Sequence, residues 1–449
     1  MVRRVGEAPV MNTRLSQNPR LRRIPGPHEM SRFWRSPIRG PWLTSVFGIV
    51  LLVGIPIEFL TGVVSWAAYD PRLHGNDVTT HHGILSVFLF DWVTSPSWIY
   101  RVSQGTHVLL GLVLVPVLLA KLWSVIPRLF AWPPLRSIAH LLERASLLLL
   151  VSGAIFEFVT GIMNIDYDYS FGFSFYDGHF FGAWVLIAGF VVHATLKFPR
   201  MWGSLRSRPL HRELQVGLSG TAPEVPEPGD DPANSLIAAN PAAPTISRRG
   251  VLGLVGGSSL AVFFLTAGQS IRSLQGISVL SPRTQSYGRG PNAFQVNRTA
   301  VAAGIRPVDI TDAWSLTLIA ESSGRNVSLT RDQLLKMQLV TADLPIACVE
   351  GWSVQERWTG VPLRQLAQHV GISHATGARV ESLERNGAFS SASLSGHQVR
   401  SPESLLALKV NGADLSLDHG YPARTIIPAA PGVHNTKWVK RITFSGVAT

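Results

Sequence analysis

Residues 344–363 read LPIACVEGWSVQERWTGVPL and contain Cys348, the only cysteine in the chain of 449 residues. A disulfide within the chain is therefore impossible. Cys348 stands at the end of LPIACV, a short apolar run typical of a strand, and a strand end is a rigid place for a functional residue. A free cysteine is often a small buried apolar residue, but a single thiolate also suits a heavy transition metal whose other sulfur ligands come from outside the protein. The choice between these uses depends on the rest of the chain.

The composition favours a membrane protein. Hydrophobic residues make up 46% of the chain and charged residues only 15%, a combination more typical of membrane proteins than of soluble ones. The chain is also too long for one compact core, so two or more domains are expected. The formal net charge is +12, but arginines that flank apolar runs account for it, and we expect no nucleic acid among the partners.

Five apolar runs are each close to the roughly 20 residues that a helix needs to cross a bilayer. They are residues 41–64, 104–126, 139–163, 179–198 and 250–268. The sequence therefore predicts a five-pass protein in contact with membrane lipid.

The distribution of charge predicts the orientation. Residues 1–40 form a basic tail with nine Arg and two Glu, and Lys and Arg also follow the second and fourth runs. The segments after the first and third runs are acidic instead. Because basic loops stay in the cytoplasm, we expect a cytoplasmic N-terminus and an extracytoplasmic C-terminal region, in the plasma membrane of a bacterium.

A polar segment separates the fourth run from the fifth. Residues 206–246 are expected to be a flexible cytoplasmic linker, because their second half is rich in Pro and lacks Lys and Arg. Ser247-Arg248-Arg249 then starts a Gly-rich apolar run, so residues 247–270 resemble a twin-arginine export signal. The alternative is that the two Arg only flank a membrane helix. In both cases the helix is expected to stay as an anchor, since LTAGQS (265–270) is a poor cleavage site.

Residues 41–205 contain an internal repeat. IPIEFLTGVV at residues 55–64 matches GAIFEFVTGIM at residues 153–163, and His107 and His179 stand at the same offset before a Pro-Arg pair. Two helix pairs inserted in the same sense place equivalent residues on opposite sides of one central site.

The histidines of this region predict one or two b-type haems. His179 and His193 are 14 residues apart in the sequence, which places them about 40° apart around a helix and about 21 Å along its axis. We expect an outer haem iron between His107 and His179 and an inner one between His140 and His193, because an intramembrane His is costly unless it is used. For His140 an ordinary polar role at a helix end stays open.

Residues 41–205 as a whole resemble a four-helix cytochrome b of the b561 and hydrogenase type. Lys121 stands where the b561 pattern has a second His on the second helix, a departure that concerns the inner haem. Glu58 and Glu157, aligned by the repeat, either hold protons for a bound quinone or quinol, contact a haem edge, or only pair the helices. His81-His82 is a candidate third set of haem ligands, and the alternative is an ordinary polar role in a loop.

Residues 280–449 have a different sequence pattern from the apolar runs before them. Short apolar segments alternate with turn sequences such as SSGR, VNGADL and PAAPG, which is typical of a β-rich domain. Helices are expected near residues 330–338 and 362–370. The predicted fold is therefore a membrane all-α four-helix haem bundle plus one further transmembrane helix, followed by a mostly β (α+β) extracytoplasmic domain.

Three stretches of this last domain resemble the sulfite-oxidase-fold molybdoenzymes, especially the periplasmic methionine-sulfoxide reductase branch. They are FQVNRTAVAAG (294–304), CVEGWSVQERWTGVPL (348–363) and LLALKVNGADLSLDHGYPARTIIPAAPGVHNTKWVKRITF (405–444). The resemblance covers about residues 290–445 and implies a molybdopterin cofactor (the molybdenum cofactor), with Cys348 as the thiolate ligand of molybdenum. Glu350, expected on the same strand face as Cys348, is either a catalytic proton relay or an ordinary carboxylate.

A pterin cofactor carries a phosphate, which suits the side chains of Arg and Lys. The candidates to bind the pterin or its phosphate are Asn297, Arg298, His419, Arg424, His434, Lys437 and Lys440. The two Lys alternatively form a solvated strand edge, whereas Arg424 is expected to meet a buried anion.

The residues after the cysteine bear on the substrate. Sulfite oxidases have a cationic segment there, whereas this chain has Val349-Glu350-Gly351-Trp352. We therefore expect a molybdenum oxidoreductase that passes electrons between the quinone pool and an extracytoplasmic substrate, reducing a small or protein-bound S- or N-oxide such as methionine sulfoxide. The alternatives are oxidation of a small sulfite-like substrate into the quinone pool, and a haem-anchored binding or sensor module without catalysis.

Overall fold

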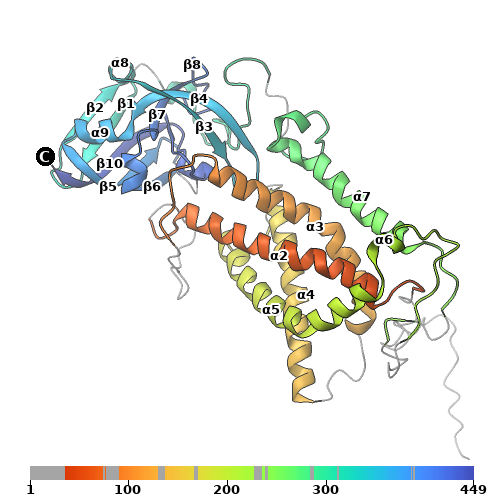
Figure 1. The fold of residues 1–449 in the computed structure, drawn as a ribbon. Helices are drawn as coiled ribbons and strands as arrows, with labels where there is room; N and C mark the ends of the chain where they lie inside the picture. Colours follow the sequence, from red (N-terminus) through yellow and green to blue (C-terminus); the bar gives the residue numbers. More distant parts are fainter. Residues whose placement is uncertain are drawn as a thin grey trace, which may run out of the picture.

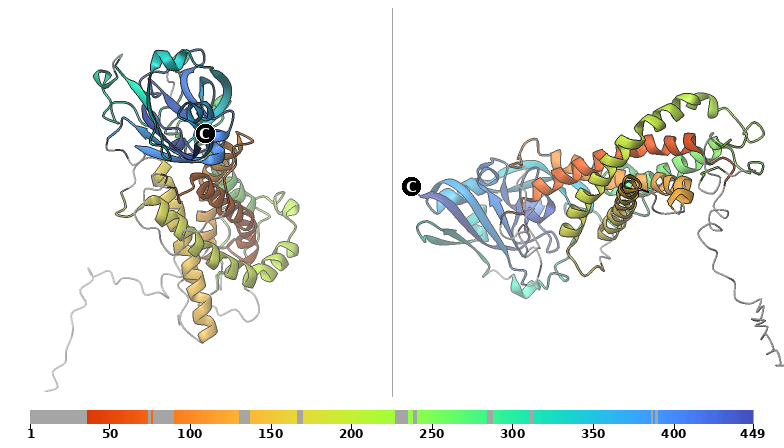
Figure 2. Two further views of the ribbon diagram at one scale, coloured as in Figure 1. Left: turned by 90° about the vertical axis from the view of Figure 1, so that its left-hand side faces the viewer. Right: turned by 90° about the horizontal axis from the view of Figure 1, so that it is seen from below.

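A computed structural model of the protein describes residues 36–73, 76, 90–129, 137–165, 170–226, 235–237, 241–283, 288–310, 313–385, 387 and 390–448. The long helices between residues 41 and 269 are called the helical part below, and the β-rich unit of residues 288–448 is called the β domain. The β domain lies against one end of the helical part (Figures 1 and 2).

Five long helices of the helical part coincide with the five predicted apolar runs. They are α2 (Pro41–Tyr69), α3 (Ile99–Leu129), α4 (Ile138–Ile165), α5 (Phe175–Ser207) and α7 (Arg248–Thr266). All five are long and apolar enough to cross a membrane. Helices α2, α3 and α5 extend beyond the predicted runs toward the β domain, where their residues Tyr69, Tyr100 and Tyr176 pack in a cluster with Ala347 of the β domain.

The helices pack in pairs that follow the repeat. Helix α2 packs on α3 and α4 packs on α5, while α5 also contacts α2 and α7 lies along α3. Aliphatic residues that face inward, such as Leu51, Leu114 and Leu186, form the shared core. Others, such as Leu60 and Leu148, stay exposed on the outer faces, as expected where lipid covers them.

Two five-stranded sheets form the β domain. The first has the order β2-β1-β10-β5-β6, from Asn326–Thr330, Ser315–Ala320, Val439–Ala448, Ile372–Ser382 and Ser391–Ser395. The second has the order β3-β4-β7-β8, from Val340–Ala347, Ser353–Pro362, Leu405–Val410 and Ala413–Asp414, with β9 (Arg424–Ile426) paired to β7. Strands β1 and β10 are parallel, and the other neighbours are antiparallel.

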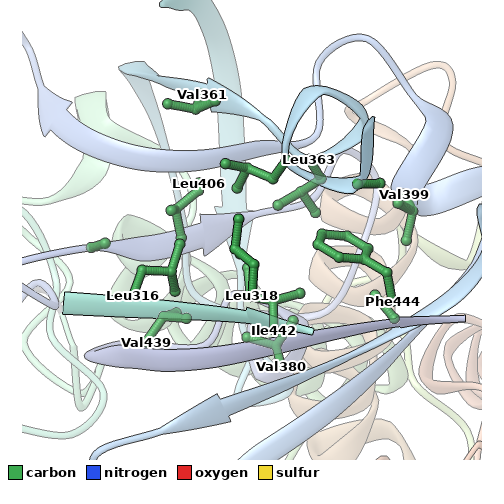
Figure 3. Close-up of a cluster of buried hydrophobic side chains, with 14 of the residues drawn as sticks. Leu316, Leu318, Val361, Leu363, Val380, Val399, Leu406, Val439, Ile442 and Phe444 are labelled. Atoms are coloured by element: carbon green, nitrogen blue, oxygen red, sulfur yellow. The ribbon is translucent and has the colours of Figure 1, made fainter. Parts of the chain in front are cut away.

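The main core of the β domain is built from side chains of both sheets and of three short helices (Figure 3). Alternate residues of β1, such as Leu316 and Leu318, point into this core, as the period of two in a strand requires. Helices α8 (Arg331–Leu335) and α9 (Leu363–His369) lie where helices were predicted, and α10 (Gly396–Arg400) was not predicted. The mostly β fold of this region is confirmed.

A buried ion-pair cluster lies at the start of α7. Arg248, the first Arg of the twin-arginine-like motif, lies 3.1 Å from Glu213 at the end of α6 (Leu210–Glu213) and 2.5 Å from Glu224. Arg208 pairs with the same two carboxylates at 3.7 and 2.7 Å. The linker expected over residues 206–246 is thus packed in its first part, because its carboxylates meet these two cations.

Candidate functional site

Cys348 lies in a tight turn that directly follows strand β3. Its backbone N–H donates to the carbonyl of Trp352 at 3.0 Å, and the N–H of Gly351 donates to the carbonyl of Cys348 at 3.0 Å. Gly351 has φ +87°, and a Cβ there would lie 2.6 Å from the side chain of Val108 in α3. Only glycine fits this position, both for its backbone conformation and for the close approach of the helical part.

Glu350 stands beside the thiol for a different reason than the one predicted from strand alternation. Strand β3 ends at Ala347, so both Cys348 and Glu350 belong to the turn. The Glu350 carboxylate accepts a hydrogen bond from the indole N–H of Trp352 at 2.7 Å. Burial of Cys348, and next the neighbouring Glu350, raise the pKa of the thiol well above its usual value. The free protein therefore holds a protonated thiol, and a metal must displace that proton to bind.

A loop from the third family-like stretch passes against Cys348. Pro431 forms an isolated bridge with Ala347, and a Cβ on Gly432 would lie 3.6 Å from the Cys348 sulfur. His434 follows in the same short 3₁₀ turn, Gly432–His434. The cysteine turn and this loop together form one site.

Arg424 supplies a buried cation to the site. Its side chain is 5% exposed, lies over the ring of Trp358, and donates to the carbonyls of His419 and Asn435 at 3.1 and 3.2 Å. Its Nε has no partner, and no carboxylate pairs with it among the residues that the structure describes. Burial lowers the pKa of Arg424 to about 9. A buried cation without a counter-charge is costly, so the arrangement is suited to a bound anion.

Lys437 and Arg298 lie at the edge of the same site. The Lys437 ammonium donates to the carbonyls of Arg298 at 2.6 Å and of Asp418 at 2.9 Å. Burial, and next the charge of Arg424, lower the pKa of Lys437 to about 7. Arg298 itself pairs with Glu384 at 2.7 Å, and the Asn297 side chain accepts from the backbone N–H of Arg298 at 2.9 Å.

The two predicted histidines of the site are both buried, at 3% and 0% exposure for His419 and His434. The Nε2 of His419 contacts the carbonyl of Asn292 at 3.0 Å, and that of His434 contacts the carbonyl of Tyr69 at 3.2 Å. A carbonyl only accepts, so both rings carry the proton on Nε2. Burial lowers their pKa values to about 3 and about 4. The Nδ1 of His434 is then a buried acceptor without a partner among the described residues.

Four buried polar atoms without a partner among the described residues lie within residues 424–436. They are Arg424 Nε, His434 Nδ1, Asn435 Nδ2 and Thr436 Oγ1. Cofactors rich in phosphate and ring nitrogens need such groups, so the residues fit a molybdopterin. Asn435 and Thr436 were not singled out in the sequence, although both stand in the quoted stretch that ends with HNTKWVKRITF. Lys440, in strand β10, is half-buried, and its part in this site stays a prediction.

A second site lies between the helices, where His107 and His179 face each other. Their ring centres are 6.2 Å apart and the ring planes are at 85°. Two imidazoles that bind one metal ion from opposite sides, with metal–nitrogen distances near 2.0–2.1 Å, have ring centres about 6 Å apart. Both rings line one cavity of about 180 Å³.

The repeat explains how both rings are held. His107 Nδ1 lies 3.1 Å from the Glu58 carbonyl and 3.2 Å from the Glu58 carboxylate, and His179 Nδ1 lies 3.1 Å from the Glu157 carboxylate. The hydroxyls of Thr61 and Thr160 lie 3.1 and 2.9 Å from the same two nitrogens. Acceptors at Nδ1 keep the proton there and leave Nε2 as the free metal-binding nitrogen.

His140 and His193 line a larger cavity, of about 460 Å³, near the opposite end of the bundle. Lys121 and Glu143 share its wall. The Lys121 ammonium donates to the carbonyl of Thr44 at 2.8 Å, so this side chain is held by the backbone of α2. His81 and His82 lie outside the described residues.

Comparison with known proteins bears on the β domain. Residues 303–448 match the family described as oxidoreductase molybdopterin binding domain. Sulfite oxidase from Arabidopsis thaliana is 36% identical over 110 residues, which cover 20% of this chain and 28% of that protein. Inducible nitrate reductase 1 (NADH) from Glycine max is 36% identical over 98 residues, which cover 20% of this chain and 11% of that protein.

Among solved structures, the sulfane dehydrogenase SoxCD from Paracoccus pantotrophus matches with 23% identity and a TM-score of 0.27, over 31% of this chain and 39% of its own; this likeness is too low to support an argument. The matched region covers 28% of the length of the sulfite oxidase and 11% of that of the nitrate reductase. Residues 303–448 are a molybdopterin-binding oxidoreductase domain of the sulfite oxidase and nitrate reductase type.

Proposed function

We propose that the protein is a membrane-bound molybdenum oxidoreductase that passes electrons between the quinone pool and an extracytoplasmic substrate through b-type haem. The proposed reaction is reduction of an S- or N-oxide such as methionine sulfoxide. The observation that carries the proposal is that the matched domain buries both Cys348 and the Arg424 guanidinium, which has no carboxylate partner among the described residues.

Named residues have distinct parts in holding molybdopterin. The Cys348 thiolate would bind the metal, Arg424 and Lys437 would meet the phosphate, and His434 Nδ1 would accept a hydrogen bond from the pterin. When bound, the molybdenum centre supplies oxygen-atom transfer, which protein side chains do not perform. Glu350 is proposed to hold a proton for the departing oxygen, because its carboxylate is oriented by Trp352.

Electrons and protons balance for this reaction. Reduction of an oxide consumes two electrons and two protons and releases water, and oxidation of a quinol releases two of each.

The outer haem is proposed to lie between His107 and His179. Support comes from the opposed rings, the free Nε2 atoms and the shared cavity. An inner haem between His140 and His193 is the further proposal, supported by their common cavity. Each haem would supply one-electron transfer.

A neutral oxide is the preferred substrate class. Val349-Glu350-Gly351-Trp352 contains one carboxylate and no Lys or Arg, so this segment itself supplies no cationic partner for a dianion. Oxidation of a small sulfite-like substrate is the second candidate, and the relatives named as sulfite oxidases favour it.

The proposed location is a bacterial plasma membrane, with five spans and lipid around α2–α5 and α7. Arg-rich segments at the α2 start and after α5 support a cytoplasmic location for those ends. The β domain, at the other end of the bundle (Figure 1), would then face outside, with α7 kept as its anchor.

Metal analysis of detergent-purified protein tests the proposal. We expect one molybdenum per chain with one or two irons, and loss of molybdenum but not iron in Cys348→Ser. Iron without molybdenum, from a host that makes the cofactor, would overturn the enzyme and leave the non-catalytic haem module.

Spectra of the haem then give the direction of electron flow. Methionine sulfoxide should reoxidise the reduced haem. Reduction of the oxidised haem by sulfite would favour the second candidate instead.

A further inference from the structure

The turn after Cys348 is bound to the helical part and its adjoining segment through three consecutive backbone carbonyls. The carbonyl of Val349 accepts from the Gln104 side chain at 2.7 Å, and that of Glu350 accepts from the Gln269 side chain at 3.1 Å. The carbonyl of Gly351 accepts from the hydroxyl of Ser270. No side chain of the turn is needed for these bonds, so they fix its backbone.

Gln104 stands apart from the other two donors because of its place in α3. It lies three residues before His107, which is about one helical turn, and it is 3% exposed. Val108, one residue after His107, packs against Gly351. One turn of α3 thus carries both the proposed haem ligand and the contact with the cysteine turn.

The two sites meet at Val349. Its side chain lines the cavity that also contains His107 and His179, and its backbone adjoins Cys348. Ala347, Tyr69 and Tyr100 are buried together around this contact.

We propose that Gln104 is a positioning residue that fixes the cysteine turn at contact distance from the His107–His179 site. This inference rests on the function proposed above. Electron transfer weakens steeply with distance, so a turn free to move away from α3 would slow the exchange between the two cofactors. The bond from Gln104 to the Val349 carbonyl opposes that movement.

The first test uses cofactor-free protein and needs no activity. Since Cys348 is the only cysteine, the rate of its alkylation by a maleimide reports opening of the turn. Loss of the hydrogen bond to the Val349 carbonyl should raise that rate about tenfold in Gln104→Met. Gln398→Met is the matched control, because Gln398 is also buried but caps α10, away from the turn.

The second test separates positioning from general damage in loaded protein. Reduced methyl viologen can deliver electrons to the β domain directly, whereas a quinol must deliver them through the helical part. We expect Gln104→Met to lower the quinol-driven rate of methionine sulfoxide reduction about tenfold relative to the viologen-driven rate, with an unchanged haem spectrum.

Alkylation at the wild-type rate, or an equal fall with both donors, would overturn the inference. If wild-type protein contains neither molybdenum nor haem, the proposed function fails, while the alkylation comparison still decides whether Gln104 holds the turn.

Discussion

At the scale of single residues, Arg424 and its surroundings are the strongest sign of a bound anion. A guanidinium inside a protein usually has a carboxylate partner, yet Arg424 has two carbonyls and the face of Trp358. Its charge therefore opposes folding of the empty protein and favours binding of a phosphate.

These two effects give a prediction of opposite signs for Arg424→Met. Without cofactor, the variant should unfold at the same or a higher temperature, because even a buried ion pair can be replaced by apolar side chains at no cost or with a gain of about 1–4 kcal/mol, and Arg424 has no counter-charge among the described residues. With cofactor, its molybdenum content should fall at least about tenfold. Thermal unfolding and metal analysis measure the two effects. The control is Arg441→Met, at a surface position. A large loss of stability in the empty variant would contradict the assignment.

The buried histidines predict how stability depends on pH. The folded state holds the pKa of His434 at about 4, whereas an unfolded chain has about 6.5. The unfolded state therefore binds more protons between these values, so the stabilisation is complete above pH 6.5 and is lost as pH falls toward 4, by at most about 3 kcal/mol. Thermal unfolding of cofactor-free protein from pH 8 to 4 should show a shallower loss in His434→Gln than in wild type. His374→Gln, at an exposed site, should keep the wild-type profile.

At the scale of elements, the repeated helix pair has a clear physical use. Each copy supplies a Glu, a Thr and a Gly that face the partner histidine, and a Cβ on Gly62 or Gly161 would lie 3.2 or 3.5 Å from the ring of His107 or His179. The Glu residues, for which three roles were open, contact the histidines directly in the structure.

Removing the threonine partners should therefore weaken the proposed outer haem in both copies. We expect Thr61→Val and Thr160→Val each to lower haem affinity by about 10- to 100-fold, and Gly62→Val to displace His107 and abolish binding. Absorbance titration of haem into haem-free protein measures this. Gly203→Ala in α5, where a Cβ meets nothing within 4 Å, should bind normally; equal loss there would point to a general defect of the bundle.

The same elements show what a sequence can and cannot predict. The five helices and the β character of residues 280–449 follow from local patterns of length and alternation, and the repeat already paired His107 with His179. The turn that places Glu350 depends on where β3 ends, and the contacts of Gln104 depend on how the β domain meets α3. Such contacts between distant segments leave no periodic signal, which is also why Asn435 and the packing of Glu224 were missed.

At the scale of the whole molecule, the two ends of the bundle have different kinds of contact. The end near the β domain is joined by aromatic packing and backbone hydrogen bonds. The other end is joined by ion pairs, in which Arg248 is buried and Arg249 is exposed. Of the two arginines in the twin-arginine-like motif, Arg248 thus belongs to the packed structure and Arg249 is accessible.

This division predicts that export and stability respond to different substitutions. The double variant Glu213→Gln with Glu224→Gln leaves Arg248 buried without a counter-charge and should cost about 3–5 kcal/mol, with normal delivery of the β domain. Arg249→Lys should keep the unfolding temperature and reduce delivery, if the motif is an export signal. Accessibility of the β domain to protease added from outside measures delivery, and thermal unfolding measures stability. Normal delivery of Arg249→Lys would assign the motif to flanking charge alone.

The carbonyl contacts of the cysteine turn also have a consequence for biogenesis. Gln269 and Ser270 travel with the β domain, but Gln104 belongs to a helix inserted earlier in the chain. If the domain crosses the membrane already folded, it meets Gln104 only on arrival. On the proposed function, a cofactor-loaded domain would then receive no electrons from the helical part while in the cytoplasm, and would become active only after it has crossed the membrane.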